Sequence, residues 1–566
     1  EKKMMSVKRL YRNCRIYTMN DSNPVCQAMV TDGNKIIYAG NTAKAKAIAG
    51  SNAEIADLDG MVILPAFCDA HVHAPGLAYD ILFNINLYPA ISEKETMDII
   101  RSHISSHPEK EMYYGRGFNV NFFSGEEGIV GPRKERLDEI CADKPIIISD
   151  FGGNCMWMNT PALAKYNITP DRKCPAGGEI VTDPRTGELW GIIRNEARCF
   201  VPYQEFSDEE NYRAMKFFQD TLLSKGYTSV LALRPPGTVE PRTTLFEAFK
   251  VLEDRGELKL RVNGARDMDP AGDIDAQLEE MLHTKEKVKT SQMQLTTAKF
   301  FLDGVIEGLD GFLLEPYSDA AGKGNSFTGC LFWDKDKLAE AFEKCMKKGF
   351  QIHCHSIGDG ATHDALDAME TALEKVAPDD YRNTLTHLQL VSDEDKQRMA
   401  DMNIIATVQP YWHFKSPAMF GLEKELLDER AETEYPLASL KSRGVMLVSS
   451  SDYPVTPNPY PFCAIEAGVT RNLINACDLG IDDITDMDDE RYLLCKDERV
   501  SVTDMIKSFT CNSSYSRFTE DIIGTIEEGK LADFIIIDSD PYEISPADIE
   551  KIKVISTYFD GEKVYG

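Results

Sequence analysis

The sequence predicts an α/β protein: a (β/α)8, TIM-like barrel with a small β-sandwich domain built from both termini. Two observations predict this fold. The middle of the chain alternates short apolar runs with amphipathic helical stretches, and eight such runs can be counted, the strand number of a barrel. Both ends of the chain instead contain short strand-like segments separated by turns.

The two ends are expected to fold together. The turn Asp32-Gly33-Asn34 separates two N-terminal strands, and Asp560-Gly561 separates two C-terminal strands. The expected strands are 10–17, 28–32 and 35–39 at the start of the chain, and 532–538, 554–559 and 562–565 at its end. We therefore expect a sandwich of residues 1–65 and 521–566, with the barrel, residues 66–520, inserted between them.

The central region supplies the barrel strands. They are expected at 66–71, 227–233, 259–264, 296–302, 350–355, 384–389, 404–409 and 445–451. Helical stretches such as 335–348 and 361–375 lie between them. The gap between the first two strands is far longer than one helix needs, so residues from about 75 to 205 are expected to form an insertion above the barrel mouth.

Composition excludes several classes of partner. The net charge of -30, from 92 acidic and 62 basic residues, argues against nucleic acid and anionic membranes. No apolar run approaches the roughly 20 residues that span a bilayer. The 14 cysteines are scattered without any Cys-x-x-Cys, which favours reduced thiols and a cytoplasmic location.

The most informative motif is a His-x-His pair, His71 and His73, in Pro65-Ala66-Phe67-Cys68-Asp69-Ala70-His71-Val72-His73. Side chains two apart on a strand point the same way, so both imidazoles face one point. Neutral imidazole is the commonest metal ligand in proteins. The alternative is two histidines at a strand–loop junction, but only 10 histidines occur in 566 residues and several others also follow predicted strands.

Polar residues at four further strand ends complete a candidate constellation. They are Lys299 and Asp303 after the fourth strand, His355 after the fifth, His387 after the sixth and Asp452 after the eighth. The carboxyl ends of barrel strands converge on one cavity, where barrel enzymes do their chemistry. Four histidines, an aspartate and a lysine would be costly to bury there without a metal.

These motifs resemble the amidohydrolase superfamily, specifically the YtcJ-like branch, amidohydrolase family 3, of metal-dependent hydrolases. The matching motifs are Pro-x-Phe-x-Asp-x-His-x-His, Lys299…Asp303-Gly304-Val305-Ile306-Glu307, His355-Ser356-Ile357-Gly358-Asp359, Ser451-Asp452-Tyr453-Pro454-Val455 and Gly529-Lys530-Leu531-Ala532-Asp533-Phe534. The resemblance covers nearly the whole chain. It is specific for the superfamily and poorly specific for substrate.

The resemblance implies a role for each ligand. His71 and His73 would hold one divalent metal ion, most simply Zn²⁺, and His355 and His387 another. Lys299 would bridge the two as a carbamate, and Asp452 would contact the metal and serve as catalytic base. Two alternatives stay open: Lys299 could be an ordinary lysine beside Asp303 in a one-metal site, and His353 is better explained as a core histidine than as a ligand.

The insertion is expected to shape substrate choice. Gly115-Arg116-Gly117-Phe118-Asn119 and Gly152-Gly153-Asn154-Cys155-Met156-Trp157 resemble pocket-lining segments of the family, although the second has Gly152-Gly153-Asn154 where Asp-Gly-His is more common. The candidate substrate-binding residues are Phe118, Asn154, Trp157, Asp303 and Trp412. Each aromatic residue could equally belong to the core.

We therefore expect an enzyme that cleaves a non-peptide C–N bond (an amide, N-formyl or cyclic amide) in a small hydrophobic or aromatic substrate. Alternatives are lyase, decarboxylase or ester-cleaving chemistry at the same metal site, and a non-catalytic scaffold. The scaffold is least favoured because all six candidate ligand positions are filled. A homodimer is possible, since the superfamily's two-domain fold often dimerises.

Overall fold

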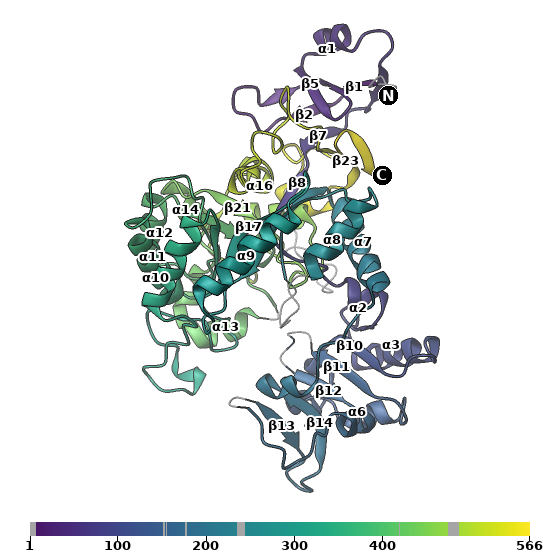
Figure 1. Cartoon of the computed structure of the whole chain (residues 1–566), viewed down its shortest axis with the longest axis vertical. Helices are drawn as coiled ribbons and strands as arrows, with labels where there is room; N and C mark the ends of the chain where they lie inside the picture. Colours follow the sequence, from purple (N-terminus) through teal and green to yellow (C-terminus); the bar gives the residue numbers. More distant parts are fainter. Residues whose placement is uncertain are drawn as a thin grey trace. The chain divides into compact units, whose positions relative to one another are not determined.

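The computed structural model describes residues 7–150, 153, 155–175, 178–234, 244–417, 419–473 and 486–566. The chain divides into two compact units, each of which packs mainly against itself. One unit comprises residues 1–74, 219–234 and 241–566, and the other is built on residues 75–218 (Figure 1). Helix α7 (Asp208–Ser224) crosses the boundary between them in sequence.

The first unit contains the barrel, an eight-stranded parallel sheet in the order β21-β20-β19-β18-β17-β16-β15-β8. The strands are β8 (Phe67–His73), β15 (Tyr227–Leu233), β16 (Arg261–Asp267), β17 (Met293–Phe301), β18 (Gln351–Ser356), β19 (Thr384–His387), β20 (Ile405–Val408) and β21 (Leu447–Ser449). Hydrogen bonds from Asp452 N to His71 O (2.9 Å) and from His73 N to Tyr453 O (2.8 Å) join the two edges. The predicted barrel is therefore confirmed, strand by strand and in order.

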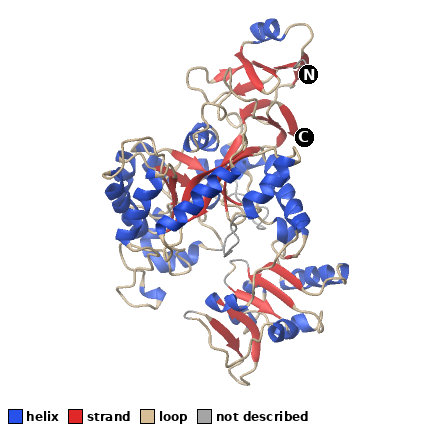
Figure 2. Ribbon diagram, in the orientation of Figure 1, coloured by secondary structure: helices blue, strands red, loops and turns tan. Residues whose placement is uncertain are grey.

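Burial explains why most of these segments are rich in apolar residues, although β16 also contains Arg261, Asn263, Arg266 and Asp267. Every residue of β15 and β16 is buried, because one face of each strand fills the barrel and the other is covered by helices. Helices α9 (Ile274–Val288), α10, α11 and α16 (Val502–Phe509) pack on the strands β17, β18 and β21 (Figures 1 and 2). The two helices expected from periodicity are present as α10 (Lys335–Lys347) and α11 (Asp359–Leu373).

The remaining helices of this unit connect successive strands or flank the barrel. They are α1 (Thr42–Ala49), α8 (Thr244–Asp254), α9 (Ile274–Val288), α12 (Asp393–Asp401), α13 (Phe420–Leu427), α14 (Ala438–Ser442), α15 (Pro461–Thr470), α16 (Val502–Phe509) and α17 (Cys511–Ser516), with 3-10 turns η3 (Asp319–Ala321), η4 (Pro410–Trp412), η5 (Asp428–Thr433), η7 (Lys496–Glu498) and η8 (Pro546–Lys551).

Strands from the two ends of the chain form two further sheets, β5-β4-β1-β6 and β24-β23-β22-β7-β2-β3. They are β1 (Lys8–Arg12), β2 (Arg15–Tyr17), β3 (Val25–Cys26), β4 (Ala28–Asp32), β5 (Lys35–Gly40), β6 (Glu54–Asp57), β7 (Val62–Pro65), β22 (Phe534–Ile537), β23 (Val554–Phe559) and β24 (Glu562–Tyr565). Tyr11 and Met29 of the first sheet share a buried core with Ile63 and Phe534 of the second. The two ends of the chain thus fold against each other.

The single strand expected over residues 10–17 is wrong. The structure has two strands there, β1 and β2, which belong to different sheets. Asn13 lies between them with a positive φ of 54°. A left-handed residue turns the chain, and asparagine tolerates that conformation better than most residues.

A buried ion-pair group attaches the C-terminal strands to the barrel. The guanidinium of Arg261, at the start of β16, contacts both carboxylate oxygens of Asp533 at 3.1 Å and Asp560 at 2.8 Å. Arg261 and Asp533 are buried, and the Arg–carboxylate geometry is bidentate. Removing one partner would leave an uncompensated buried charge.

The second unit has its own mixed sheet, β13-β14-β12-β11-β10-β9, and its own cores. Its strands are β9 (Ile85–Asn86), β10 (Tyr113–Phe118), β11 (Ile146–Asp150), β12 (Cys155–Met158), β13 (Glu179–Thr182) and β14 (Leu189–Arg194); its helices are α2 (Ala78–Leu82), α3 (Glu93–Ser106), α4 (Glu127–Val130), α5 (Lys134–Asp138) and α6 (Thr160–Lys165), with η1 (Val120–Phe122) and η2 (Asn195–Phe200).

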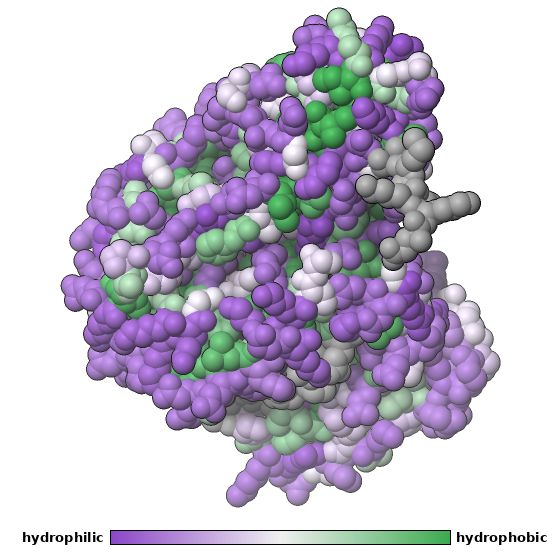
Figure 3. Space-filling view, turned by 45° about the horizontal axis from the view of Figure 1, so that its top comes forward, coloured by the Kyte–Doolittle hydropathy of each residue, from purple (hydrophilic) through white to green (hydrophobic). Residues whose placement is uncertain are grey.

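The face drawn in Figure 3 is dominated by hydrophilic side chains, with small scattered apolar areas. This agrees with the charged composition of the chain. Among the described residues, no helix is both long and apolar enough to cross a bilayer. Every cysteine in the described part of the chain is a free thiol.

Candidate metal centre

The His-x-His pair lies at the carboxyl end of β8, where both side chains are buried. The two imidazole rings are 5.2 Å apart, and their Nε2 atoms face the same oxygen, Asp452 Oδ1. His71 Nε2 lies 3.3 Å and His73 Nε2 3.2 Å from that oxygen. The first and last strands of the barrel thus bring their predicted residues together.

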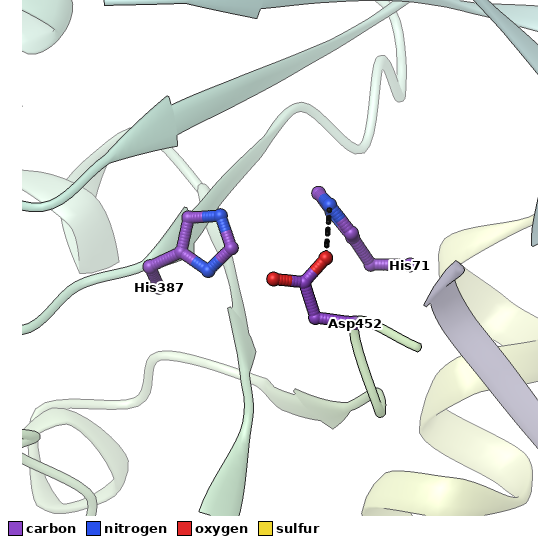
Figure 4. A group of neighbouring side chains, drawn as sticks. All are labelled: His71, His387 and Asp452. Atoms are coloured by element: carbon purple, nitrogen blue, oxygen red, sulfur yellow. Dashed lines mark ion pairs between the residues drawn. The ribbon is translucent and has the colours of Figure 1, made fainter. Parts of the chain in front are cut away.

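His387 completes a compact group with His71 and Asp452 (Figure 4). One ligand atom from each of the three residues lies within 4.8 Å of the others, and all three side chains are buried. His387 and Asp452 both have positive φ values, 76° and 55°. Left-handed backbone is unfavourable for residues other than glycine and persists where the surrounding structure holds it, often at functional sites.

His355 and Lys299 lie beside this group. The His355 ring is 4.5 Å from the His387 ring, and its Nε2 is 3.1 Å from the carbonyl oxygen of Gly304. Lys299, in β17, has no exposed surface, and its Nζ has no hydrogen-bond partner among the described residues. An unpartnered buried amine is rare because its desolvation is costly.

Hydrogen bonds define which nitrogen of three imidazoles is free. The carbonyl oxygen of Arg234 accepts from His73 Nδ1, and the carbonyl oxygen of Gly304 accepts from His355 Nε2. Gln409 Oε1 lies 2.8 Å from His387 Nδ1, while Gln409 Nε2 contacts the hydroxyls of Thr386 and Ser450. Because an oxygen acceptor fixes the N–H, the second nitrogen of each ring carries a lone pair.

The donor set fits a divalent cation. His73 Nε2, as a lone-pair donor, faces a carboxylate oxygen, Asp452 Oδ1, that lacks a hydrogen-bond partner in the described part of the chain. Electron-pair donors that close to one another repel unless a positive charge lies between them. Neutral imidazole and carboxylate are also the ligand types that zinc and related metals take.

Burial controls the charges in the site. It lowers the pKa of His71 and His387 well below the usual value and that of His355 to about 3, so these rings are neutral. Burial also lowers the pKa of Lys299 to about 8.

The predicted substrate-binding residues lie in different parts of the structure, and only some are near the candidate metal centre. Trp412 is half-buried, stacks on His387 with ring centres 5.9 Å apart, and donates from Nε1 to Thr456. Phe118 and Trp157 lie in the hydrophobic core of the second unit, where packing accounts for both. A substrate contact by either residue stays a prediction. Asn154 lies outside the described residues.

Asp303 binds backbone N–H groups, and the substrate contact expected for it stays a prediction. Its carboxylate accepts hydrogen bonds from the backbone N–H groups of Phe312 (2.9 Å), Ile357 (3.0 Å) and Gly358 (2.8 Å). The side chain is buried. The structure therefore favours Asp303 as the residue that ties the segment after β17 to the segment after β18, next to His355.

Two positioning residues were not predicted. Asp69 Oδ1 accepts from the backbone N–H groups of His71 and Ser451, at 3.2 and 3.0 Å, and so fixes the residue preceding Asp452 against β8. Gln409 orients His387 as described above. Asp69 lies within β8 and Gln409 directly follows β20, and nothing in a single sequence separates such an orienting residue from a ligand.

A cavity of about 230 Å³ lies beside the metal-ligand residues. It is lined by Arg234, Asp267, Met268, Asp269, Pro270, Phe301 and Phe332. The Phe301 ring packs on His355, with centres 5.5 Å apart, and lies 4.7 Å from Lys299 Nζ. Phe301 therefore forms a wall shared by the cavity and the candidate metal centre, and Phe332 adds a second aromatic ring to the cavity lining.

Comparison with known proteins places the chain in a family. The chain is 25% identical to "Putative amidohydrolase YtcJ" of Bacillus subtilis (99% of each chain). It is 22% identical to "N-substituted formamide deformylase" of Arthrobacter pascens (97% of this chain, 96% of the relative). A metal-dependent hydrolase of Pyrococcus horikoshii has a similar structure, with TM-score 0.72, 25% identity and coverage of 95% of this chain and 99% of that one. The sequence model of the Amidohydrolase family matches residues 54–565, so the chain belongs to the amidohydrolase family.

Proposed function

We propose that this protein is a metal-dependent hydrolase that cleaves a non-peptide C–N bond (an amide, N-formyl or cyclic amide bond) in a small substrate with an apolar or aromatic substituent. The observation that carries the proposal is the convergence of buried ligand atoms from His71, His387 and Asp452 within 4.8 Å. His73, His355 and Lys299 surround them, at the carboxyl ends of barrel strands, where barrel enzymes hold their active sites.

The candidate residues have two proposed roles, metal binding and proton transfer. His71 and His73 would hold one ion, His355 and His387 a second, and Lys299 would bridge them once its amine is carboxylated. We propose zinc, which suits imidazole and carboxylate ligands. When bound, such an ion lowers the pKa of a water molecule to about 7 and polarises the scissile carbonyl.

Asp452 is the proposed catalytic base. Its Oδ1 lies 3.3 Å from His71 Nε2 and 3.2 Å from His73 Nε2, and a carboxyl group is ionised at neutral pH. It would take the proton of the attacking water and return it to the leaving nitrogen, which cannot depart as an anion. Positive φ at Asp452 and the hydrogen bond from its N–H to His71 O fix its position.

The cavity supports the substrate class. Phe301, Phe332 and Met268 offer apolar contact, and the Arg234 guanidinium, paired with Asp267 through Nε, makes the pocket polar at one side. Trp412 offers a further aromatic surface beside His387. An N-substituted amide or formamide with an aromatic group matches this lining, and a relative is described as a formamide deformylase.

Turnover of a mixed substrate panel, measured by mass spectrometry, tests the proposal. The panel holds N-formyl amines, N-acyl amino acids, aryl amides, cyclic ureas and esters, and zinc-loaded wild type is compared with Asp452→Asn. We expect wild type to cleave an amide class, and the isosteric variant to retain metal but lose about 10²- to 10⁴-fold in turnover. Near-normal activity of Asp452→Asn would contradict the base assignment. Cleavage of esters alone would contradict the C–N assignment.

A further inference from the structure

One buried histidine near the centre is not used by the proposed mechanism. His353 lies in β18, two residues before His355, and is 1% exposed. Its Nε2 lies 2.8 Å from His71 Nδ1, and its Nδ1 contacts the hydroxyl of Thr384, in the neighbouring strand β19. The three side chains form a hydrogen-bonded row, Thr384–His353–His71, that ends at Asp452 Oδ1, 3.3 Å from His71 Nε2.

His71 differs from the other three candidate ligands in its hydrogen-bond partner. His73, His355 and His387 each contact an oxygen, from Arg234, Gly304 and Gln409, and an oxygen acceptor leaves one tautomer. The partner of His71 is another imidazole, which can either accept or donate. The tautomer of His71 therefore depends on the tautomer of His353.

Thr384 allows the tautomer that a metal needs. Its Oγ1 lies 3.4 Å from the carbonyl oxygen of Ile352, so its hydroxyl can donate there while it accepts from His353 Nδ1–H. His353 Nε2 is then an acceptor, His71 Nδ1 carries the proton, and His71 Nε2 presents a lone pair toward Asp452. If His353 Nε2 instead donated a hydrogen bond to His71 Nδ1, then His71 Nε2 would carry the proton of that ring and could not bind a metal.

We infer that His353 is a positioning residue for the metal centre: it fixes the tautomer and ring orientation of His71, with Thr384 as its own anchor. The inference rests on the proposed function, since it assigns His71 as a ligand. Outer partners of ligating histidines are usually carboxylates, carbonyls or water, and their loss weakens metal affinity by about 10- to 100-fold. Here an imidazole takes that place.

The test measures zinc affinity by chelator competition on the folded full-length protein, without any substrate. We expect His353→Phe, which removes the acceptor, to raise the zinc Kd of the His71 site by about 10- to 100-fold. His353→Gln, whose Oε1 can reach His71 Nδ1, should stay within a few-fold of wild type. His353→Asn, one methylene shorter, should behave like His353→Phe.

Two further measurements separate positioning from loss of structure. Cys354→Ala alters the same strand at a buried side chain that alternates to the opposite face, and should leave the zinc Kd unchanged. The Co²⁺-substituted protein should show a changed visible absorption spectrum in His353→Phe and His353→Asn, and a wild-type-like spectrum in His353→Gln.

The outcomes are distinguishable. Equal zinc Kd values for wild type, His353→Asn and His353→Gln would overturn the inference while leaving the metal site intact. If His353→Phe fails to fold, the zinc Kd values of His353→Asn and His353→Gln still test the inference. Both variants carry an amide and differ only in the length of the side chain. Absence of zinc binding by the wild type would overturn the proposed function, and this inference with it.

Discussion

At the scale of single residues, the centre is defined by which nitrogen of each imidazole is free. Neighbouring oxygens hold one nitrogen of His73, His355 and His387, and the other is left as a donor. The sequence predicts the residue types and their strand ends. It does not predict the tautomers, because Gly304 and Arg234 contribute only backbone oxygens, which any residue would supply.

Lys299 is expected to be carboxylated in the protein. A buried amine with its pKa lowered to about 8 is partly neutral near neutral pH and can react with carbon dioxide. We expect Lys299→Met to bind fewer metal equivalents than wild type, measured by inductively coupled plasma mass spectrometry. Protein prepared in ¹³C-bicarbonate should show a carbamate carbon signal by NMR that the variant lacks.

Lys335→Met is the control for that change, because its side chain is exposed and its ion-pair partner, Asp364 on α11, is not a candidate ligand. It should retain the metal content and the carbamate signal of wild type. Two metal equivalents in Lys299→Met would show that no bridging carbamate is needed.

At the scale of elements, the segments that follow the strands place the ligands. Asp69 fixes Ser451 against β8, and Asp303 gathers three backbone N–H groups beside His355. From the motif after the fourth strand, Asp303 was predicted to bind substrate, and its hydrogen bonds to backbone N–H groups were not predicted. In a sequence, an aspartate that contacts substrate looks the same as one that binds backbone N–H groups. Only the structure shows which contacts the side chain makes.

Helix α15 and the 3-10 turn η8 carry a prediction about pH. Glu466, buried on α15, accepts a hydrogen bond from the N–H of Glu550 in η8, and burial raises its pKa to about 8. The unfolded carboxyl has a pKa of about 4.3. Ionisation therefore costs folding free energy: the cost is absent below about pH 4, grows as the pH rises, and is complete above about pH 8.

Glu466→Gln keeps the acceptor oxygen and removes the charge. We expect the variant to melt at a higher temperature than wild type at pH 8, by an amount that shrinks as the pH falls toward 5, as measured by differential scanning calorimetry. Each pKa unit is worth about 1.4 kcal/mol, so the full effect is a few kcal/mol. Exposed Glu528→Gln is the control. A difference in melting temperature independent of pH would contradict the assignment.

At the scale of the whole molecule, the eight barrel strands could be predicted because most are short, buried and mainly apolar runs separated by helical stretches. We could predict that the two ends of the chain fold together because both contain short strand-like segments separated by turns. The break at Asn13 was missed because two short strands with one turn residue between them read as a single strand. The packing of Phe118 and Trp157 was not predictable, since aromatic residues suit a core and a pocket equally.

We propose above all that the carboxyl ends of the barrel strands hold a metal ion. Anomalous diffraction from crystals of the protein, recorded on both sides of the zinc absorption edge, tests it most directly. We expect one or two strong anomalous peaks bounded by the candidate ligands, which are His71, His73, His355, His387, Lys299 and Asp452. Zinc-supplemented crystals with no peak there, or with peaks only at other residues, would contradict it.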